Sequence, residues 1–159
     1  MKKLIILFCC IFSVFASKAV TLNLDLHCLI QGYYSSNGQM TPAAYNQGCP
    51  WATPGMSDRI LVQLRKGGAP YSIVGQAIAS LPTSGHLLVN ISNDKLTNGS
   101  YYLVIKNMRN GLETWSSAPV SFVSGIYTVY DFTTSANKAY GNNMVKVTDS
   151  ETLQGYYCF

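Results

Sequence analysis

The chain has 159 residues, of which 48% are hydrophobic and only 11% charged, and its formal net charge is +4. Three of the lysines lie before residue 20, so the rest of the sequence contains eight basic and seven acidic residues. It lacks the cluster of Lys and Arg that a nucleic-acid partner requires. No second long apolar run follows the N-terminal one, so we expect the mature chain not to span a membrane.

Met1–Ala19 has the order of a secretory signal peptide. Two lysines come first, an apolar run extends from Leu4 to Phe15, and small residues close the segment. We therefore expect the protein to be exported and to be secreted or displayed at the cell surface. The remaining residues, 20–159, have the length of one domain.

The first segment of this domain, Val20–Gln31, places most of its apolar residues on one parity and its polar residues on the other. The apolar positions are Leu22, Leu24, Leu26, Cys28 and Ile30. Successive side chains of a strand point to opposite faces, so this period of two predicts a β-strand with one buried side and one wet side.

Further short runs rich in aromatic and β-branched residues predict more strands. They cover residues 60–65, 73–81, 87–91, 101–105, 120–123, 127–132, 144–147 and 152–157. The run 73–81 has no clean period, which is typical of a strand covered on both sides. About eight strands in one small domain predict an all-β fold, an antiparallel β-sandwich.

Turn residues separate these runs. Asn98-Gly99 and Asn110-Gly111 offer the positive φ angles of tight turns, and Ser84-Gly85 predicts a hairpin between the runs 73–81 and 87–91. The segment Gly32–Ser57 is rich in Gly, Ser, Asn and Pro and is too long for a simple connection. We expect it to be a functional loop or to contain a short regular element.

Seven phrases of the sequence, taken in order, resemble a known kind of module. They are Leu29–Tyr34, Met40–Gly48, Asp58–Arg65, Gly99–Lys106, Leu112–Ser116, Tyr130–Thr133 and Ala139–Val145. Together they are similar to the β-sandwich modules near the C-terminus of many large secreted bacterial surface proteins. The middle part also resembles a transthyretin-like, carboxypeptidase-regulatory-like sandwich. In the surface proteins a dockerin-like or sorting segment usually follows, whereas this sequence ends at Phe159. The resemblance implies an accessory module with no named activity.

Catalytic patterns are absent from the sequence. The seven acids are dispersed, which favours solvated or turn-capping roles over a catalytic carboxylate pair. His27 and His86 have no metal-ligand spacing and are expected to be hydrogen-bonded surface residues. Cys28 lies in the apolar stripe, where thiols are inert, so pairing with His86 as a nucleophile is disfavoured. We expect no enzyme, no metal and no cofactor. The alternative is a small secreted glycan- or peptide-directed hydrolase, which requires the acids or both histidines to converge in a pocket.

Three cysteines remain after the signal peptide, an odd number for an oxidising compartment. A Cys28–Cys49 bridge would join the first strand to the long irregular segment. A free, buried state is the alternative, and Cys158 can also pair with either cysteine or with another molecule.

Four aromatic residues of the Gly32–Ser57 segment are candidate binding residues. They are Tyr33, Tyr34, Tyr45 and Trp51. Flat rings stack on sugar faces and peptide side chains, and binding surfaces tend to lie on loops. The competing interpretation is that the rings fasten the loop to the sandwich, and Trp115 is expected to be a core or edge anchor. The sequence thus predicts a non-catalytic module for adhesion, assembly or spacing that contacts protein or polysaccharide through residues 32–57.

Overall fold

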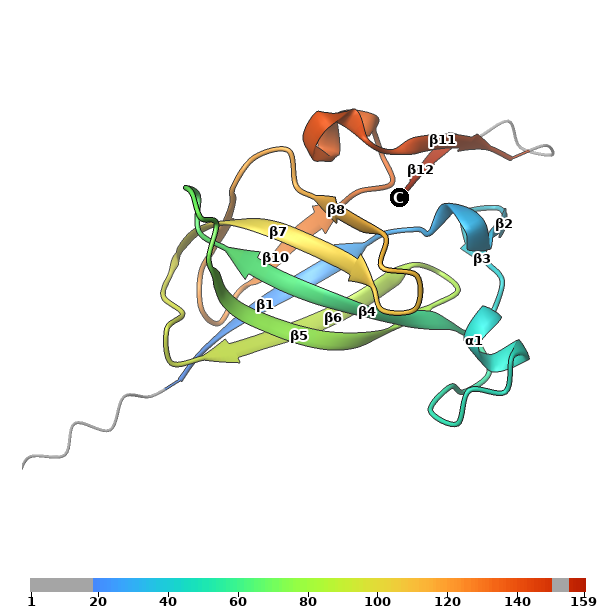
Figure 1. Cartoon of the computed structure of the whole chain (residues 1–159), viewed down its shortest axis with the longest axis horizontal. Helices are drawn as coiled ribbons and strands as arrows, with labels where there is room; N and C mark the ends of the chain where they lie inside the picture. Colours follow the sequence, from blue (N-terminus) through green and yellow to red (C-terminus); the bar gives the residue numbers. More distant parts are fainter. Residues whose placement is uncertain (1–18, 150–154) are drawn as a thin grey trace, which may run out of the picture.

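Two β-sheets face each other in the computed structural model of the chain, which describes residues 19–149 and 155–159 (Figure 1). The predicted signal peptide, apart from Ala19, lies outside these residues, as does the beginning of the predicted strand 152–157. The described residues are mostly β-structure, which confirms the predicted all-β sandwich.

The smaller sheet has three strands in the order β10-β1-β6, with bounds β1 Val20–His27, β6 His86–Asn93 and β10 Tyr127–Asp131. Strand β1 pairs antiparallel with β6 but parallel with β10, so the sandwich is antiparallel except for this pair. Leu22, Leu24 and Leu26 are fully buried while their neighbours along β1 are partly exposed, which confirms the predicted alternation as far as His27. Beyond His27 the prediction is wrong, because Cys28, Leu29 and Ile30 are all buried and Gln31 belongs to a 3-10 helix.

The larger sheet has five strands, all antiparallel, in the order β5-β4-β7-β8, with β9 paired to β7. Their bounds are β4 Met56–Arg65, β5 Ile73–Pro82, β7 Gly99–Asn107, β8 Glu113–Trp115 and β9 Val120–Phe122. Of these, β8 was not predicted. Gly111, in the turn between β7 and β8, has the expected positive φ of 75°, whereas Gly99 opens β7 and has no positive φ.

Shorter elements lie around the two sheets. They are η1 Gln31–Tyr33, β2 Tyr34–Ser36, β3 Gln39–Met40, α1 Ala43–Asn46, η2 Ala136–Lys138, η3 Tyr140–Asn142, β11 Val145–Thr148 and β12 Gly155–Cys158. Strand β2 pairs with β3, and β11 pairs with β12. The first four elements are in or next to the Gly32–Ser57 segment, which confirms that it contains short regular structure. In Figure 1 they lie together at one end of the sandwich.

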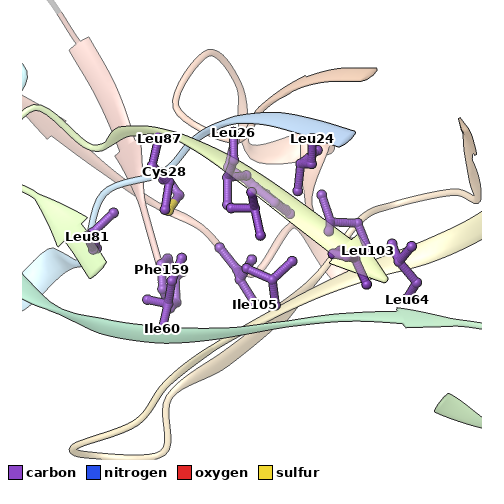
Figure 2. Close-up of a cluster of buried hydrophobic side chains, with 14 of the residues drawn as sticks. Leu24, Leu26, Cys28, Ile60, Leu64, Leu81, Leu87, Leu103, Ile105 and Phe159 are labelled. Carbon is purple, nitrogen blue, oxygen red and sulfur yellow. The ribbon is translucent and has the colours of Figure 1, made fainter. Parts of the chain in front are cut away.

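The core fills the space between the two sheets. Figure 2 shows Leu24, Leu26 and Leu87 of the smaller sheet pointing toward Ile60 and Leu103 of the larger one. All of these side chains are buried. Burial of a Leu or Ile side chain contributes about 1.5–3 kcal/mol, so this shared apolar layer is what holds the sheets together.

Two predictions about β5 are wrong. Strand β5 is not covered on both sides: it is the edge of the five-stranded sheet, and Ile78 on its outer face is 60% exposed. Ser84-Gly85 does not close a hairpin either, because β5 pairs with β4 while β6 pairs with β1. The turn carries the chain from one sheet to the other. The first prediction failed because Ile78 is an apolar residue on the exposed face, so the alternation of apolar and polar residues is not visible in the sequence. The second failed because a tight turn does not specify which strands pair with each other.

The passage between the sheets depends on Gly85. Its φ is +71°, and a Cβ at this position would lie 2.4 Å from the carbonyl oxygen of Cys28. We therefore expect Gly85→Ala to lower the free energy of unfolding by about 2 kcal/mol, measured by urea denaturation. Gly111 is the matched control, because its φ is +75° but no atom lies within 4 Å of the added Cβ. Gly111→Ala should lose about half as much, and equal losses would contradict the proposed clash.

Candidate functional site

The outer face of the five-stranded sheet carries polar and aromatic side chains. On β4, Ile60, Val62 and Leu64 are buried in the core, so the odd-numbered positions 59–65 belong to the outer face. The register places Arg65 opposite Tyr102 of β7. Trp115 of β8 lies opposite Val104, two residues after Tyr102 on β7 and on the same face. Strand pairing thus brings aromatic residues from separate strands to one end of this face.

Four aromatic rings converge at that end around a cavity of about 360 Å³. The rings that line it are Tyr71, Tyr102, Trp115 and Tyr140, which we call the aromatic pocket. The centroid of the Tyr71 ring is 5.9 Å from that of Trp115 and 6.0 Å from that of Tyr102, with interplanar angles of 90° and 74°. These are favourable edge-to-face contacts. Tyr140 is 67% exposed, so the pocket is open to solvent.

Two loops complete the aromatic pocket. Tyr71 is in the connection between β4 and β5, where its φ is +53° and its N–H donates to the carbonyl oxygen of Gly68. Such a φ is uncommon for a bulky residue and is often associated with function. Tyr140 follows Ala139, which forms a β-bridge with Ser116 directly after β8. Residues distant in sequence are therefore fixed beside Trp115 by backbone contacts.

Polar side chains hold the rings and one cation in place. The Arg65 guanidinium carbon lies 4.9 Å from the Trp115 ring centroid, in cation–π contact. Its Nη2 and Nε donate to Oε1 of Gln63, at 2.6 and 3.1 Å, and Gln63 donates to Gln76 at 3.1 Å. The indole N–H of Trp115 donates to Glu113 at 2.6 Å. The side chains are oriented before any ligand arrives, which reduces the entropic cost of binding.

A second cavity of about 300 Å³ lies at the other end of β4. It is lined by Trp51, Asp58, Arg59, Met108 and Arg109, and we call it the Trp51 pocket. The Arg59 guanidinium carbon is 4.2 Å from the centroid of the Trp51 ring. The Trp51 pocket therefore repeats the combination of tryptophan and arginine found at the aromatic pocket.

Asp58 organises the structure around the Trp51 pocket. Its carboxylate is only 2% exposed, and Oδ2 accepts hydrogen bonds from Tyr33, Asn107 and Arg109 at 2.8, 3.2 and 3.2 Å. Oδ1 accepts the backbone N–H of Arg59 at 2.8 Å. Burial, reinforced by Asp58, raises the pKa of Tyr33 to about 12, so Tyr33 remains a hydrogen-bond donor. Asp58 is thus a buried structural anion, although the sequence favoured a solvated or capping role.

The structure separates the four aromatic residues singled out from the sequence. Tyr33 and Trp51 both reach the surroundings of Asp58, the first through its hydroxyl and the second as a wall of the Trp51 pocket. Tyr34 instead packs its ring against Tyr156, with 6.0 Å between centroids. Tyr45 lies on α1 and is 46% exposed.

The sequence pointed to none of the tyrosines of the aromatic pocket, and it predicted Trp115 as an anchor only. Tyr102 and Trp115 could have been found from the alternation along their strands, because each lies next to buried residues and so points away from the core. Tyr71 and Tyr140 lie in connections, whose contacts depend on the whole fold.

The two histidines form a second cluster, on the outer side of the three-stranded sheet. His27 and His86 are opposite each other in the register of β1 and β6, with ring centroids 6.2 Å apart. Nδ1 of His27 is 3.4 Å from Asp131, and Nε2 of His86 is 2.7 Å from Asp25. The acids are therefore less dispersed than the sequence suggested, and both histidines are hydrogen-bonded as expected. Neither histidine lines the aromatic pocket or the Trp51 pocket.

The His27–Asp131 pair predicts a pH dependence of stability. The hydrogen bond to Asp131 raises the pKa of His27 above 6.5, although burial opposes it. Burial alone would raise the pKa of Asp131, but hydrogen bonds from His27 and Thr133 lower it to about 2. The contribution of His27 is complete below pH 6.5 and is lost as pH rises through its folded pKa. The contribution of Asp131 is complete above pH 3.8 and is lost as pH falls toward 2.

We therefore expect the pair to stabilise the fold most between about pH 4 and pH 6.5. Urea unfolding at pH 5.5 and pH 8.5 should show a loss of stability at the higher pH, and His27→Gln should reduce that loss. His86→Gln, which keeps the contact between His27 and Asp131, is the control and should retain it. An unchanged pH dependence in His27→Gln would contradict this assignment.

The cysteines are unbridged in the structure. Cys28 and Cys158 are buried, and burial raises the pKa of Cys158 to about 11 and that of Cys28 further. Cys49 is half-buried, with its Sγ accepting a hydrogen bond from Arg109 at 3.1 Å. The Cys28–Cys49 bridge stays a prediction for the oxidised protein.

Within residues 19–149 and 155–159, no three His, Cys, Asp or Glu side chains are placed to hold a metal ion. In the same part of the chain, no helix has the length and apolar character needed to cross a membrane. Comparison of the chain with models of protein families, with curated proteins and with solved structures found no match. The resemblance to surface-protein modules therefore stays a prediction.

Proposed function

We propose that this chain is a secreted, non-catalytic β-sandwich module that binds polysaccharide through the aromatic pocket. The observation that carries the proposal is the convergence of four aromatic rings around an open cavity of about 360 Å³. Sugar rings have apolar C–H faces that pack against aromatic side chains, while their hydroxyls need polar partners at the rim. Arg65, which Gln63 and Trp115 hold in place, supplies such a partner.

The chemistry of the pocket lining favours binding over bond cleavage. All four lining residues are aromatic, so they include no carboxylate pair for glycoside hydrolysis. Glu113, beside the pocket, accepts the indole N–H of Trp115 and lies 3.8 Å from Lys106. These contacts give Glu113 a positioning role. We therefore prefer a binding module to the secreted hydrolase.

The sequence supports the location and the setting of this function. The signal-peptide order of Met1–Ala19 favours export, and the resemblance of later phrases in the sequence to bacterial surface modules favours adhesion or assembly at the cell surface. An immunoglobulin-like or transthyretin-like topology is part of the same proposal. In this proposal the binding surface lies on the larger sheet and includes Trp51, but is not confined to residues 32–57.

Affinity electrophoresis tests the proposal. The purified protein is run through gels that contain polygalacturonate, xylan, mixed-linkage β-glucan or dextran, and in parallel it is offered proline-rich and acidic peptides. We expect retardation by at least one polysaccharide and its relief by soluble fragments of that polysaccharide. No retardation by any polysaccharide, or binding of peptides alone, would overturn it.

A further inference from the structure

We infer that the ligand is a long acidic polysaccharide that lies along β4 and contacts both the aromatic pocket and the Trp51 pocket. This inference rests on the proposed function and names the substrate class. Three features of the outer face support it: the spacing of its two pockets, the surface between them, and the charge of its arginines.

The two pockets lie on one face and are aligned along one strand. Arg59 and Arg65 are both at odd-numbered positions of β4, six residues apart, so they are separated by about 20 Å. Each guanidinium packs on a tryptophan, Arg59 on Trp51 at 4.2 Å and Arg65 on Trp115 at 4.9 Å. A ligand that contacts both pairs must therefore be extended, which favours an internal stretch of a polymer over a short sugar.

The surface between the pockets can support such a chain. The register of β4 and β5 places Leu61 opposite Ile78, which is 60% exposed, and Gln63 opposite Gln76. The apolar pair can pack against the C–H faces of sugars. Gln76, which is exposed and accepts a hydrogen bond from the buried Gln63, offers its amide to hydroxyl groups. Because β5 is the edge strand, no further strand of the larger sheet lies beyond this surface on that side.

The charge of the face indicates an acidic polymer. Arg109 is paired with Asp58 and Lys106 with Glu113. In contrast, no carboxylate of the described residues lies within ion-pair distance of the Arg59 or Arg65 guanidinium. A planar guanidinium held on an aromatic ring presents a fork of donors that suits a carboxylate group, and Arg65, whose Nε and Nη2 donate to Gln63, keeps the N–H groups at its Nη1 end for this contact. Two such forks, about 20 Å apart, match a polymer that carries carboxylates along its length.

The test compares polygalacturonate with its fully methyl-esterified form, which keeps the backbone but lacks the charge. We expect isothermal titration calorimetry to show at least tenfold tighter binding of polygalacturonate than of the methyl ester or of digalacturonate. Arg59→Gln should weaken polygalacturonate binding about tenfold and leave little difference between polymer and dimer. Lys95→Gln, an exposed change after β6, is the matched control and should bind as the unchanged protein does.

The outcomes separate this inference from the proposed function. Equal binding of the polymer and its methyl ester, or no effect of Arg59→Gln, would overturn the acidic, extended ligand. If Trp115→Ala still weakened the binding of a polysaccharide about 30-fold, the proposed function would stand. Tighter binding of a single-stranded oligonucleotide than of polygalacturonate would overturn the assignment to a polysaccharide. Circular dichroism of each variant verifies folding, and Arg59→Lys, which keeps the charge without the planar fork, should show an intermediate loss if Arg59→Gln is poorly folded.

Discussion

Replacing Trp115 with alanine is expected to weaken polygalacturonate binding about 30-fold, a loss of about 2 kcal/mol. Trp115 contacts the rings of Tyr71 and Tyr102 and carries the Arg65 guanidinium, so its removal deletes a wall of the aromatic pocket and frees a cation that it positioned. The affinity is measured by isothermal titration calorimetry.

The control for this prediction comes from the segment that the sequence favoured. Tyr45 is an exposed aromatic residue on α1 and does not line the aromatic pocket or the Trp51 pocket. Tyr45→Ala should leave the affinity unchanged, while Trp115→Phe should retain part of it. The reverse result, with Tyr45 essential and Trp115 dispensable, would move the binding site to residues 32–57.

Replacing Asp58 with asparagine is expected to lower the free energy of unfolding by about 3 kcal/mol and the melting temperature by about 10 °C. The buried carboxylate accepts four hydrogen bonds, and the Arg109 cation depends on it for its ion pair. A neutral amide leaves that cation without a counter-charge and places an amide N–H₂ among donors.

Thermal unfolding monitored by circular dichroism measures this effect. Asp94 offers a matched control because it is exposed, and Asp94→Asn should change stability by less than about 0.5 kcal/mol. If both substitutions cost the same, Asp58 would not be the organising residue of the Trp51 pocket.

The layer architecture could be predicted from the sequence because it follows from a local rule. The alternation from Leu22 to Leu26 requires one buried face, and the same residues are fully buried between the sheets. The alternation of buried and exposed residues does not specify which strands pair with each other. Thus the parallel pairing of β1 with β10 and the crossing from β5 to β6 could not be predicted, since both depend on which strand meets which.

The aromatic pocket could not be predicted for a related reason. Tyr71 and Tyr140 lie in connections on either side of Trp115, and their approach depends on strand register and on the bridge between Ser116 and Ala139. The sequence favoured the Gly32–Ser57 segment as the binding site because its aromatic residues are close in sequence. Trp51 does line a pocket, but the Tyr33 hydroxyl donates a hydrogen bond to Asp58 instead. Closeness in sequence was therefore a partial guide to closeness in space.

The central position of β1 has a consequence for the biogenesis of the protein. Leu24 pairs with Val89 on one side and with Thr128 on the other, so β1 needs one partner, β10, that is synthesised much later than β1 itself. At about 5–20 residues per second, translation of the intervening segment takes about 5 s or longer. Throughout that interval the leucine side chains of β1 lack the complete three-stranded sheet, and a chaperone can bind them. The three-stranded sheet can therefore close only after β10 has left the ribosome.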